Sequence, residues 1–284
     1  MGNRELAVAI DVGGTHLRAA LVKSDGTLLK KIKREVGPKR DPKNFFSKLT
    51  SLIREVASGR EESLSGIGLG LPGICSLKEG IVHQLPHYSG WCDVPAVAIL
   101  REEFSLPIFL DNDANMAARG EHWLGAAKEL ISFWMLTLGT GIGGGLFLNG
   151  QLWHGESGFA GEVGHMTVVA DGRLCACGKK GCWEMYAASS ALPPEERTAE
   201  AWRQFGIYLG MGIANLAHIL DVEHFILGGG ISQASENFLE TALQTARERC
   251  YKKLGERLTI QPAHLKEEAN LLGCAAQVFS DSSH

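Results

Sequence analysis

The chain has 284 residues, of which 45% are hydrophobic and 21% are charged. This composition is that of a globular protein with room for one large domain or two ordinary ones, and it excludes an extensively disordered chain. The formal net charge of −4 argues against nucleic acid as a partner, because nucleic-acid binding needs clustered Lys and Arg. No apolar run approaches the ~18 residues of a membrane span, and the N-terminal residues lack a signal-peptide pattern. We therefore expect a cytoplasmic protein with no membrane partner.

The first half of the chain predicts three strands followed by helix, strand, helix and strand. Asp25-Gly26 signals a hairpin before the third strand. Asp41-Pro42 supplies the N-cap and first residue of a helix that ends near Gly59. The other helix is expected at about 94–104, and the strands at 7–11, 17–22, 27–36, 66–71 and 107–110.

The second half repeats this order of elements without a residue-level repeat. Two strands flank a glycine loop, a third strand is a candidate nearby, and a long helix, a further strand and two helices follow. The expected ranges are strands at 132–138, 144–148, 165–169 and 224–227, and helices around 205–220, 236–253 and 267–279. Each half carries a glycine turn just after its first strand. Two such lobes, each with exposed backbone N–H groups at one edge, would form a phosphate-sized cleft.

The glycine motifs do not match the commonest nucleotide sites. The chain has no G-x-x-x-x-G-K-[ST] sequence, which excludes a P-loop. The pattern G-x-G-x-x-G begins at Gly68 and at Gly139, but a dinucleotide site needs a helix directly after it. After Gly139 the chain continues as a strand, which argues against a Rossmann site.

Three glycine turns remain as candidate nucleotide contacts. Glycine lets backbone amides approach phosphate oxygens, and a carboxylate before the first turn could hold Mg²⁺. Any one of these turns could be an ordinary tight turn, but their placement in mirrored halves favours a joint role. The candidates are Asp11, Gly13, Gly14 and Thr15; Gly139, Thr140 and Gly141; and Gly228, Gly229 and Gly230.

The stretch CACGKKGCWE concentrates three of the seven cysteines in eight positions. With His165, Cys175, Cys177 and Cys182 have the composition of a closed tetrahedral zinc site, which holds structure and leaves no open position for water. Unligated cysteines are the alternative, and a disulfide is disfavoured in a reducing compartment. Zinc would fix the loop so that Glu162 and Glu184 project from a rigid base.

The segment LDNDANM leaves a strand at Leu110 and enters a helical stretch at Ala114. Asp113 therefore lies at or near a helix N-cap, where backbone amides favour an ionised carboxylate. It is either a structural N-cap or a functional group. Phosphoryl transfer to an alcohol needs a carboxylate that accepts the hydroxyl proton.

Together, DVGGTH, LGTGIGGG and LGGGIS resemble the phosphate-1, phosphate-2 and adenosine motifs of the sugar kinase, actin and heat-shock chaperone superfamily. More narrowly, GFAGEVGH followed by CACGKKGCWE resembles the signature of the ROK family, best known for bacterial glucokinases. The resemblance spans nearly the whole chain. It implies an α/β, actin-like ATPase fold with two ribonuclease-H-like lobes and an interlobe cleft. The expected lobes are 1–114 and a larger 115–266 with the zinc loop, and the C-terminal helix, about 267–284, is a candidate to pack back on the first.

The resemblance also implies roles for individual residues. Asp113 would be the general base, Asp11 a magnesium ligand, and ATP, Mg²⁺ and structural Zn²⁺ the cofactors of a homodimer. The implied sugar contacts are Asn112, Glu162, His165 and Glu184. The sequence departs from the family pattern at three places, of which the short segment bears on lid or subunit contacts and the missing asparagine on the choice of sugar. They are Asp111 where Glu is usual, a short segment at 191–198, and no asparagine before Trp91, with Gln84 the nearest candidate.

The leading hypothesis is an ATP-dependent hexose kinase that phosphorylates the 6-hydroxyl, most readily of glucose. N-acetylmannosamine, fructose and other hexoses are alternative substrates, and polyphosphate is an alternative donor. A sugar-sensing repressor of the same family would carry an N-terminal helix-turn-helix, for which six residues before the first strand leave no room. A zinc hydrolase is disfavoured because the ligand set is closed.

Overall fold

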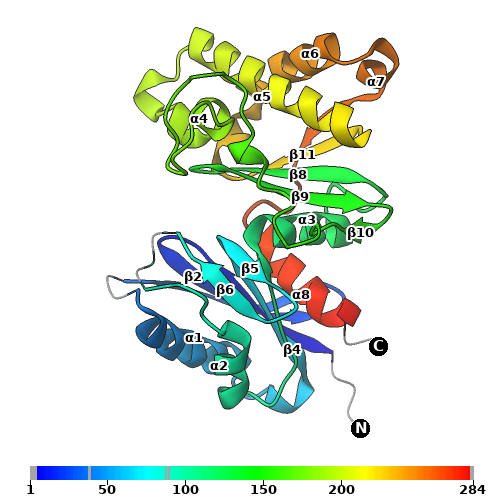
Figure 1. The fold of residues 1–284 in the computed structure, drawn as a ribbon. Helices are drawn as coiled ribbons and strands as arrows, with labels where there is room; N and C mark the ends of the chain where they lie inside the picture. The colour runs from blue at the N-terminus through cyan, green and yellow to red at the C-terminus, as the bar shows by residue number, and fades with distance from the viewer. Residues whose placement is uncertain (1–4, 38–39, 87, 89, 282–284) are drawn as a thin grey trace. The chain divides into compact units, whose positions relative to one another are not determined.

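The structure is a computed structural model that describes residues 5–37, 40–86, 88 and 90–281 (Figure 1). It divides the chain into two compact units. Unit 1 contains the chain up to Leu124 together with 155–159 and the C-terminal segment from Glu268, and unit 2 contains Gly125–His154 and Ala160–Glu267. The first division falls after Leu124 rather than at the expected residue 114, because the helix that follows residue 112 packs within unit 1.

Unit 1 is built on a five-stranded sheet in the order β3-β2-β1-β4-β7. The first three strands are antiparallel, and β4 and β7 continue the sheet in parallel. The strands are β1 (Leu6–Val12), β2 (His16–Lys23), β3 (Leu28–Glu35), β4 (Leu64–Leu71) and β7 (Ile108–Asn112). A short hairpin that the sequence pattern did not predict, β5 (Ile74–Ser76) and β6 (Ile81–Gln84), lies between β4 and β7 in the chain.

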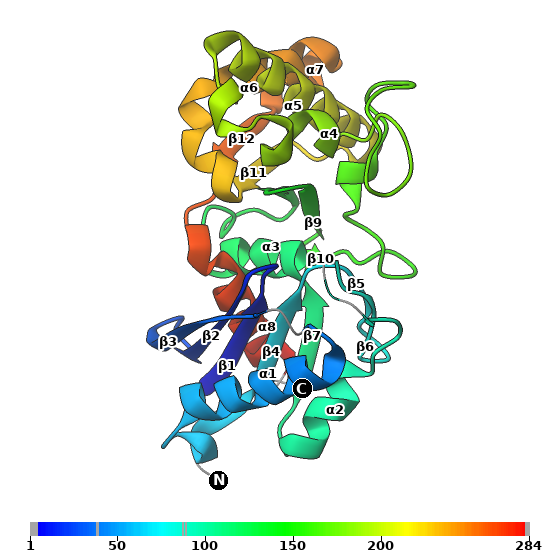
Figure 2. The same cartoon turned by 90° about the vertical axis from the view of Figure 1, so that its left-hand side faces the viewer.

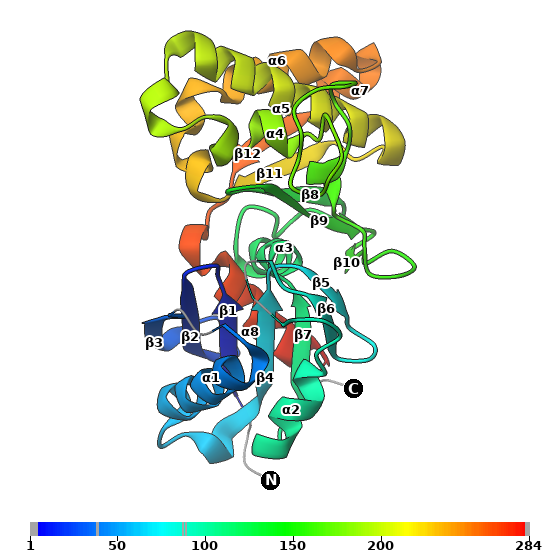
Figure 3. The ribbon, with the colours of Figure 1, turned by 60° about the vertical axis from the view of Figure 1, so that its left-hand side comes forward.

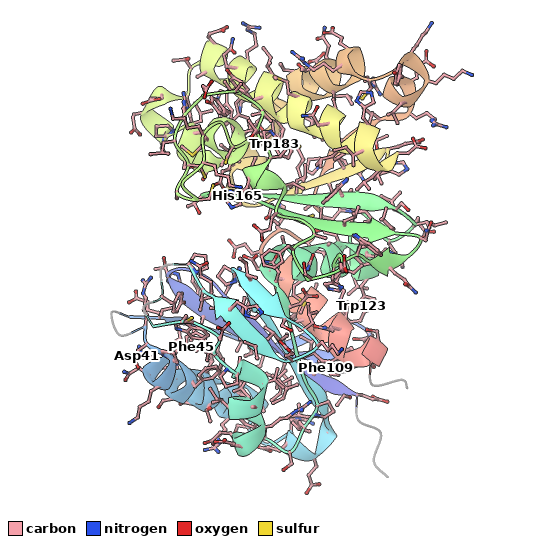
Figure 4. All side chains as sticks on the ribbon, in the orientation of Figure 1. Asp41, Phe45, Phe109, Trp123, His165 and Trp183 are labelled. Carbon is pink, nitrogen blue, oxygen red and sulfur yellow. The ribbon has the colours of Figure 1, made fainter. Side chains whose placement is uncertain are left out.

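Helices cover both faces of this sheet, with α1 and α2 on one face and α8 on the other (Figure 2). The predicted start of α1 is confirmed, since the Asp41 carboxylate accepts a hydrogen bond from the backbone N–H of Asn44 (3.1 Å) and Pro42 is the first helical residue. Figure 4 labels Asp41 and, one turn further, Phe45, which is buried in the core of the unit. The helices of unit 1 are α1 (Pro42–Ala57), α2 (Ala96–Glu103), α3 (Asp113–Leu124) and α8 (Ala269–Asp281), with the 3₁₀ turn η1 (Glu61–Ser63).

Two glycines let α3 and α8 approach each other at backbone distance. A Cβ atom added at Gly273 would lie 1.8 Å from the carbonyl oxygen of Met116, and one added at Gly120 would lie 2.1 Å from that of Ala269. The rings of Trp123, labelled in Figure 4, and Phe279 pack 6.0 Å apart further along the same pair of helices. This contact holds both helices in unit 1. Residues 282–284, part of the expected C-terminal helix, lie outside the described residues.

Unit 2 repeats the sheet topology of unit 1. Its strand order is β10-β9-β8-β11-β12, with three antiparallel strands followed by two in parallel. The strands are β8 (Phe133–Leu138), β9 (Ile142–Leu148), β10 (Gln151–Leu152), β11 (His224–Gly228) and β12 (Thr259–Pro262). The predicted duplication of topology is therefore confirmed, although β10 and β12 were not among the predicted strands.

The helices α5 and α6 lie on the same side of the unit 2 sheet (Figure 3). The apolar face of α5, including Phe205, Leu209 and Ile213, packs in one core with strand residues such as Leu136 and Phe225. No helix in the described ranges is both long and apolar enough to cross a bilayer. The helices are α4 (Glu184–Ala187), α5 (Ala199–Leu220), α6 (Leu239–Arg249) and α7 (Lys252–Arg257), with 3₁₀ segments η2 (Val163–His165), η3 (Ser189–Ala191), η4 (Pro194–Glu196), η5 (Gly230–Asn237) and η6 (Lys266–Glu268).

The strand expected at 165–169 is wrong, because β10 is the third antiparallel strand of this sheet. The backbone of this segment pairs with the cysteine loop instead. The N–H of Val168 donates to the carbonyl of Gly181 (2.9 Å), and the N–H of Trp183 donates to that of Met166 (2.8 Å). The backbone of this segment therefore anchors the cysteine loop instead of joining the sheet.

The single helix expected at 236–253 is also wrong, because the chain leaves helical geometry at Cys250, where ψ is 156°. The following N–H, of Tyr251, donates to Nε2 of His218 on α5 (3.4 Å). The segment is therefore divided into α6 and α7, with a contact to another helix at the break.

We expect Gly273→Ala to lower the free energy of unfolding. Alanine gains about 1 kcal/mol of helix propensity over glycine, but the added methyl group meets backbone and forces α3 and α8 apart. Overpacking of this kind costs about 1–3 kcal/mol, and contact with a carbonyl oxygen places this site at the upper end. Chemical denaturation measures the effect. Ser280→Ala, at an exposed position of the same helix, is the control; equal stability of both variants would contradict the close packing.

Candidate functional site

The turn that follows β1 is hydrogen-bonded at Gly13 and has free space beside Gly14. The N–H of Gly13 donates to the carbonyl of His16 (2.9 Å), and the hydroxyl of Tyr88 donates to the carbonyl of Gly13 (2.9 Å). A Cβ at Gly14 would meet no atom within 4 Å. Thr15 completes the turn, and its carbonyl accepts from the N–H of Val36 (2.9 Å). The structure thus leaves room for a ligand beside the backbone of Gly14.

The carboxylate of Asp11 is 2% exposed and both of its oxygens have partners. Arg18, the residue opposite it on β2, contacts Oδ2 at 2.5–2.6 Å, and the side chain of Asn270 donates to Oδ1 (2.8 Å). A carboxylate has about four lone-pair sites. A contact with Mg²⁺ would therefore use the lone pairs that Arg18 and Asn270 leave.

Strand β7 ends in a buried carboxylate that organises the start of α3. One oxygen of Asp111, which has no exposed surface, accepts hydrogen bonds from the N–H of Asn112 (2.7 Å) and the side chain of Asn115 (2.8 Å). The residue that departs from the family pattern thus has a structural function here. It ties the end of the strand to the first turn of the helix.

Asn112 and Asp113 stand at the junction of β7 and α3. The side-chain oxygen of Asn112 accepts from the N–H of Ala114 (2.8 Å), and its amide group donates to the carbonyl of Gly73 (3.1 Å). Asp113 is the first residue of α3; it is partly buried, and its Oδ1 also accepts from the N–H of Ala114 (2.9 Å). Strand end and helix start together fix the position of the Asp113 carboxylate.

Cys75 on β5 is a buried thiol whose pKa is affected by the two carboxylates of this region. Burial, followed by the charges of Asp111 and Asp113, raises the pKa of Cys75 to about 12. Cys75 is therefore a neutral thiol at physiological pH. It offers no competing nucleophile or base beside the two carboxylates.

In unit 2 two glycine turns adjoin each other. The first, Gly139-Thr140-Gly141, joins β8 to β9. The second, Gly228-Gly229-Gly230, follows β11, and Gly229 has a φ of +85°, which a residue with a side chain rarely adopts. A Cβ at Gly229 would lie 2.4–2.7 Å from the backbone of Leu138, so glycine is required for this close approach. The structure thus brings together two of the three predicted nucleotide turns.

The four predicted zinc ligands also come together. One ligand atom from each of His165, Cys175, Cys177 and Cys182 lies within 4.8 Å of all the others. The Sγ atoms of Cys177 and Cys182 are 3.6 Å apart, and Nδ1 of His165 is 3.7 Å from Sγ of Cys175. A zinc tetrahedron with bonds of 2.0–2.3 Å has edges of about 3.3–3.8 Å. Both of these distances lie in that range, and the donor set fits zinc in composition.

The backbone of the loop supports this arrangement. Gly178 and Gly181 both have positive φ angles, +83° and +78°, and a Cβ at Gly181 would lie 1.8 Å from the carbonyl oxygen of Val169. The next residue after the last cysteine, Trp183, is fully buried and donates from its indole to the carbonyl of Tyr208 on α5 (2.8 Å). Figure 4 labels His165 and Trp183, which anchor the loop at its two ends.

Two carboxylates border the cluster. Oε1 of Glu184 is 2.9 Å from Sγ of Cys175 and 3.5 Å from Nδ1 of His165. Oε2 of Glu162 is 3.8 Å from Nε2 of the same histidine, and its side chain is half-exposed. The predicted sugar contacts of unit 2 therefore lie side by side at the edge of the loop. A Cβ at Gly141 would lie 2.5 Å from Oε2 of Glu184, which connects them to the first glycine turn.

Sequence reasoning missed several residues that hold the site in place. They carry no local motif, because each acts through a contact distant in sequence: Ser189 and Ser190 lie 50 residues from the turn they bind, Tyr88 lies 75 residues from Gly13, and Asn270 lies 259 residues from Asp11. A hydroxyl or amide that satisfies a distant backbone group leaves no pattern in a single sequence.

Comparison with known proteins gives consistent matches. The sequence pattern that defines the ROK family matches residues 7–195 and 193–280. A glucokinase of Halalkalibacterium halodurans is 31% identical over 306 residues, covering 94% of this chain and 92% of that protein. The xylose repressor of Bacillus subtilis is 31% identical over 297 residues, covering 96% of this chain and 77% of that protein.

A solved structure matches the fold over almost the whole chain. It is a ROK family glucokinase from Streptomyces griseus in complex with glucose and AMPPNP, with a TM-score of 0.83 and 27% identity. The match covers 97% of this chain and 99% of that chain. The α/β, actin-like ATPase fold expected from the sequence is thereby confirmed.

We expect the purified protein to contain about one zinc ion per chain, as a closed four-ligand site requires. Cys177→Ser, at the exposed corner of the cluster, should lose the metal and melt at a lower temperature. Cys92→Ser, at an exposed cysteine outside the cluster, is the matched control and should keep both. Elemental analysis and thermal melting measure these outcomes. Equal zinc content in the two variants, or a fully stable zinc-free wild type, would contradict the assignment.

Proposed function

The chain belongs to the ROK family, and from this premise we propose that it is a sugar kinase that transfers the γ-phosphoryl group of ATP to the 6-hydroxyl of a hexose. Glucose is the leading substrate. The glucokinase relative and the Streptomyces griseus complex with glucose and AMPPNP support this choice. N-acetylmannosamine or fructose as acceptor, and polyphosphate as donor, are the alternatives within the same chemistry.

The observation that carries the proposal is the position of Asp113. It is partly buried at the first turn of α3, and Asp111 and Asn112 fix the backbone on which it stands. In phosphoryl transfer the protein mainly positions the reactants, and one carboxylate accepts the proton of the attacking hydroxyl. We assign that role to Asp113. Asn112, beside it, is assigned to the sugar.

The nucleotide is assigned to the three glycine turns. In the turns Gly13-Gly14-Thr15 and Gly139-Thr140-Gly141, backbone amides other than those of Gly13 and Gly139, which donate within their own turns, would bind phosphate oxygens. The turn Gly228-Gly229-Gly230 would contact the adenosine. Mg²⁺, as in phosphoryl transfer generally, would neutralise charge on the phosphates. Asp11 is the residue that would hold it, directly or through water.

The remaining sugar contacts are assigned to Glu162, Glu184 and His165. A carboxylate accepts hydrogen bonds from hydroxyl groups, and an imidazole N–H can donate one to a hydroxyl oxygen. A zinc ion held by His165 and the three cysteines would fix the orientation of these groups and take no part in the phosphoryl transfer, because four protein ligands leave no open position. A zinc hydrolase is disfavoured for the same reason.

We also propose that the protein is a homodimer, which light scattering tests.

The similarity to the Bacillus subtilis xylose repressor supports a second candidate function. A sugar-sensing regulator would bind its sugar through the same contacts without transferring phosphate. A coupled assay of ADP release over a panel of hexoses separates the two. Release with at least one hexose supports the kinase, whereas sugar binding without release on any hexose supports the regulator.

We expect Asp113→Asn to lower kcat by about 10²–10⁴-fold, the usual contribution of a general base. Asparagine preserves the size and hydrogen-bonding shape of the side chain but accepts no proton, so the melting temperature and the affinity for the sugar should stay close to those of the wild type. Steady-state kinetics and sugar titration measure these quantities. Asp93→Asn, at an exposed aspartate outside the site, is the matched control. Turnover of Asp113→Asn within a few fold of the wild type would contradict the assignment.

A further inference from the structure

The turn between β8 and β9 is held from one side by a pair of serines. The carbonyl oxygen of Gly139 accepts hydrogen bonds from both the N–H (2.8 Å) and the hydroxyl (2.7 Å) of Ser189. The carbonyl oxygen of Thr140 accepts one from the hydroxyl of Ser190 (2.6 Å). Two consecutive carbonyl groups of the turn are therefore bound by two consecutive serines.

These hydrogen bonds determine the direction in which two backbone N–H groups of the turn point. In a planar trans peptide the C=O group and the N–H group that follows it point to opposite sides. Because the carbonyls of Gly139 and Thr140 face the serines, the N–H groups of Thr140 and Gly141 face away from them. In the described part of the chain these two N–H groups donate to no other group.

Two neighbouring unpaired amides on one side of a turn form an anion-binding concavity. Access to it is open, since a Cβ at Gly139 would meet no atom within 4 Å and Thr140 is exposed. Because the carbonyl oxygens of Gly139 and Thr140 point toward the serines, their negative partial charges face away from the open side of the turn. The serines thus leave N–H groups, and not these two carbonyl oxygens, on the side where an anion could bind.

We propose that Ser189 and Ser190 are positioning residues that aim the N–H groups of Thr140 and Gly141 at phosphate oxygens of the nucleotide. The proposal rests on the proposed function, which identifies the anion as a nucleoside triphosphate. The two hydroxyls do not touch the nucleotide. They act through the backbone of the turn.

The same short segment also connects the turn to the cysteine loop. The 3₁₀ turn that carries the serines, η3, follows α4, which begins at Glu184, two residues after Cys182. Glu184 approaches both Cys175 and the Cα of Gly141. The anchored loop therefore fixes the serine pair, and the serine pair fixes the turn.

The two serines differ in a way that a test can use. Gly139 retains a hydrogen bond from the backbone N–H of Ser189 when that hydroxyl is removed. Thr140 has no such second donor in the described residues, so its carbonyl would be released when the hydroxyl of Ser190 is removed. Ser190→Ala should therefore have the larger effect, and Ser190→Thr, which retains a hydroxyl, should restore function.

The experiment compares wild type, Ser189→Ala, Ser190→Ala, Ser190→Thr and Ser280→Ala. Ser280 is the matched control, because its hydroxyl also donates to a backbone carbonyl, that of Gln277, far along the chain from the turn. The KM values for ATP and for glucose and the Kd values for tripolyphosphate and adenosine are measured. Loss of one hydrogen bond that orients the turn should raise the KM for ATP and the Kd for tripolyphosphate about 3- to 10-fold in Ser190→Ala. The effect of Ser189→Ala should be smaller, and the values for glucose and adenosine should stay within about twofold of the wild type.

Two results would overturn the positioning role while leaving the kinase intact. One is an active wild type with a Ser190→Ala variant whose KM for ATP and Kd for tripolyphosphate are unchanged. The other is an equal rise in the KM values for ATP and glucose, which would indicate general disruption. If the wild type binds neither ATP nor tripolyphosphate and phosphorylates no sugar, the proposed function fails, and the positioning role fails with it.

Discussion

The cluster of His165, Cys175, Cys177 and Cys182 is the constraint on which the candidate site of unit 2 depends. Their ligand atoms gather within 4.8 Å of one another although the histidine precedes the first cysteine by ten residues. Three thiolates at this spacing would repel each other without a cation, and zinc matches the chemistry of the donor set. The loop has no extended secondary structure of its own. Its order therefore depends on this cluster and on the buried side chain of Trp183.

The residues just after the cluster in the chain connect it to the turn between β8 and β9. Glu184 borders the cysteines, and Ser189 and Ser190 hold that turn. In unit 1 side-chain contacts also hold the ends of β1 and β7, where the buried carboxylates of Asp11 and Asp111 accept hydrogen bonds from neighbouring side chains. In both units, side-chain hydrogen bonds hold the backbone beside a glycine turn or a strand end.

The sequence predicted those parts of the fold and site that local patterns encode. Apolar runs of strand length, the Asp41-Pro42 helix start and the glycine turns all depend on neighbouring residues, and the structure has them where expected. The cysteine cluster could be predicted because three ligands fall within eight positions. The strand expected at 165–169 is wrong because the backbone of this segment pairs with the cysteine loop. The helix expected at 236–253 is wrong because the chain turns at Cys250, where the next N–H contacts His218, a residue distant in sequence. Strand β12 and the serine pair depend on distant partners, which a single sequence does not show. Strand β10 pairs with its neighbour β9 but is only two residues long.

The most direct measurement of the central claim is a crystal structure of the protein with glucose and AMPPNP. The account predicts that a carboxylate oxygen of Asp113 lies within about 2.6–3.2 Å of the sugar hydroxyl that faces the γ-phosphate. A well-ordered sugar whose reacting hydroxyl has another group, or only water, at that distance would contradict it.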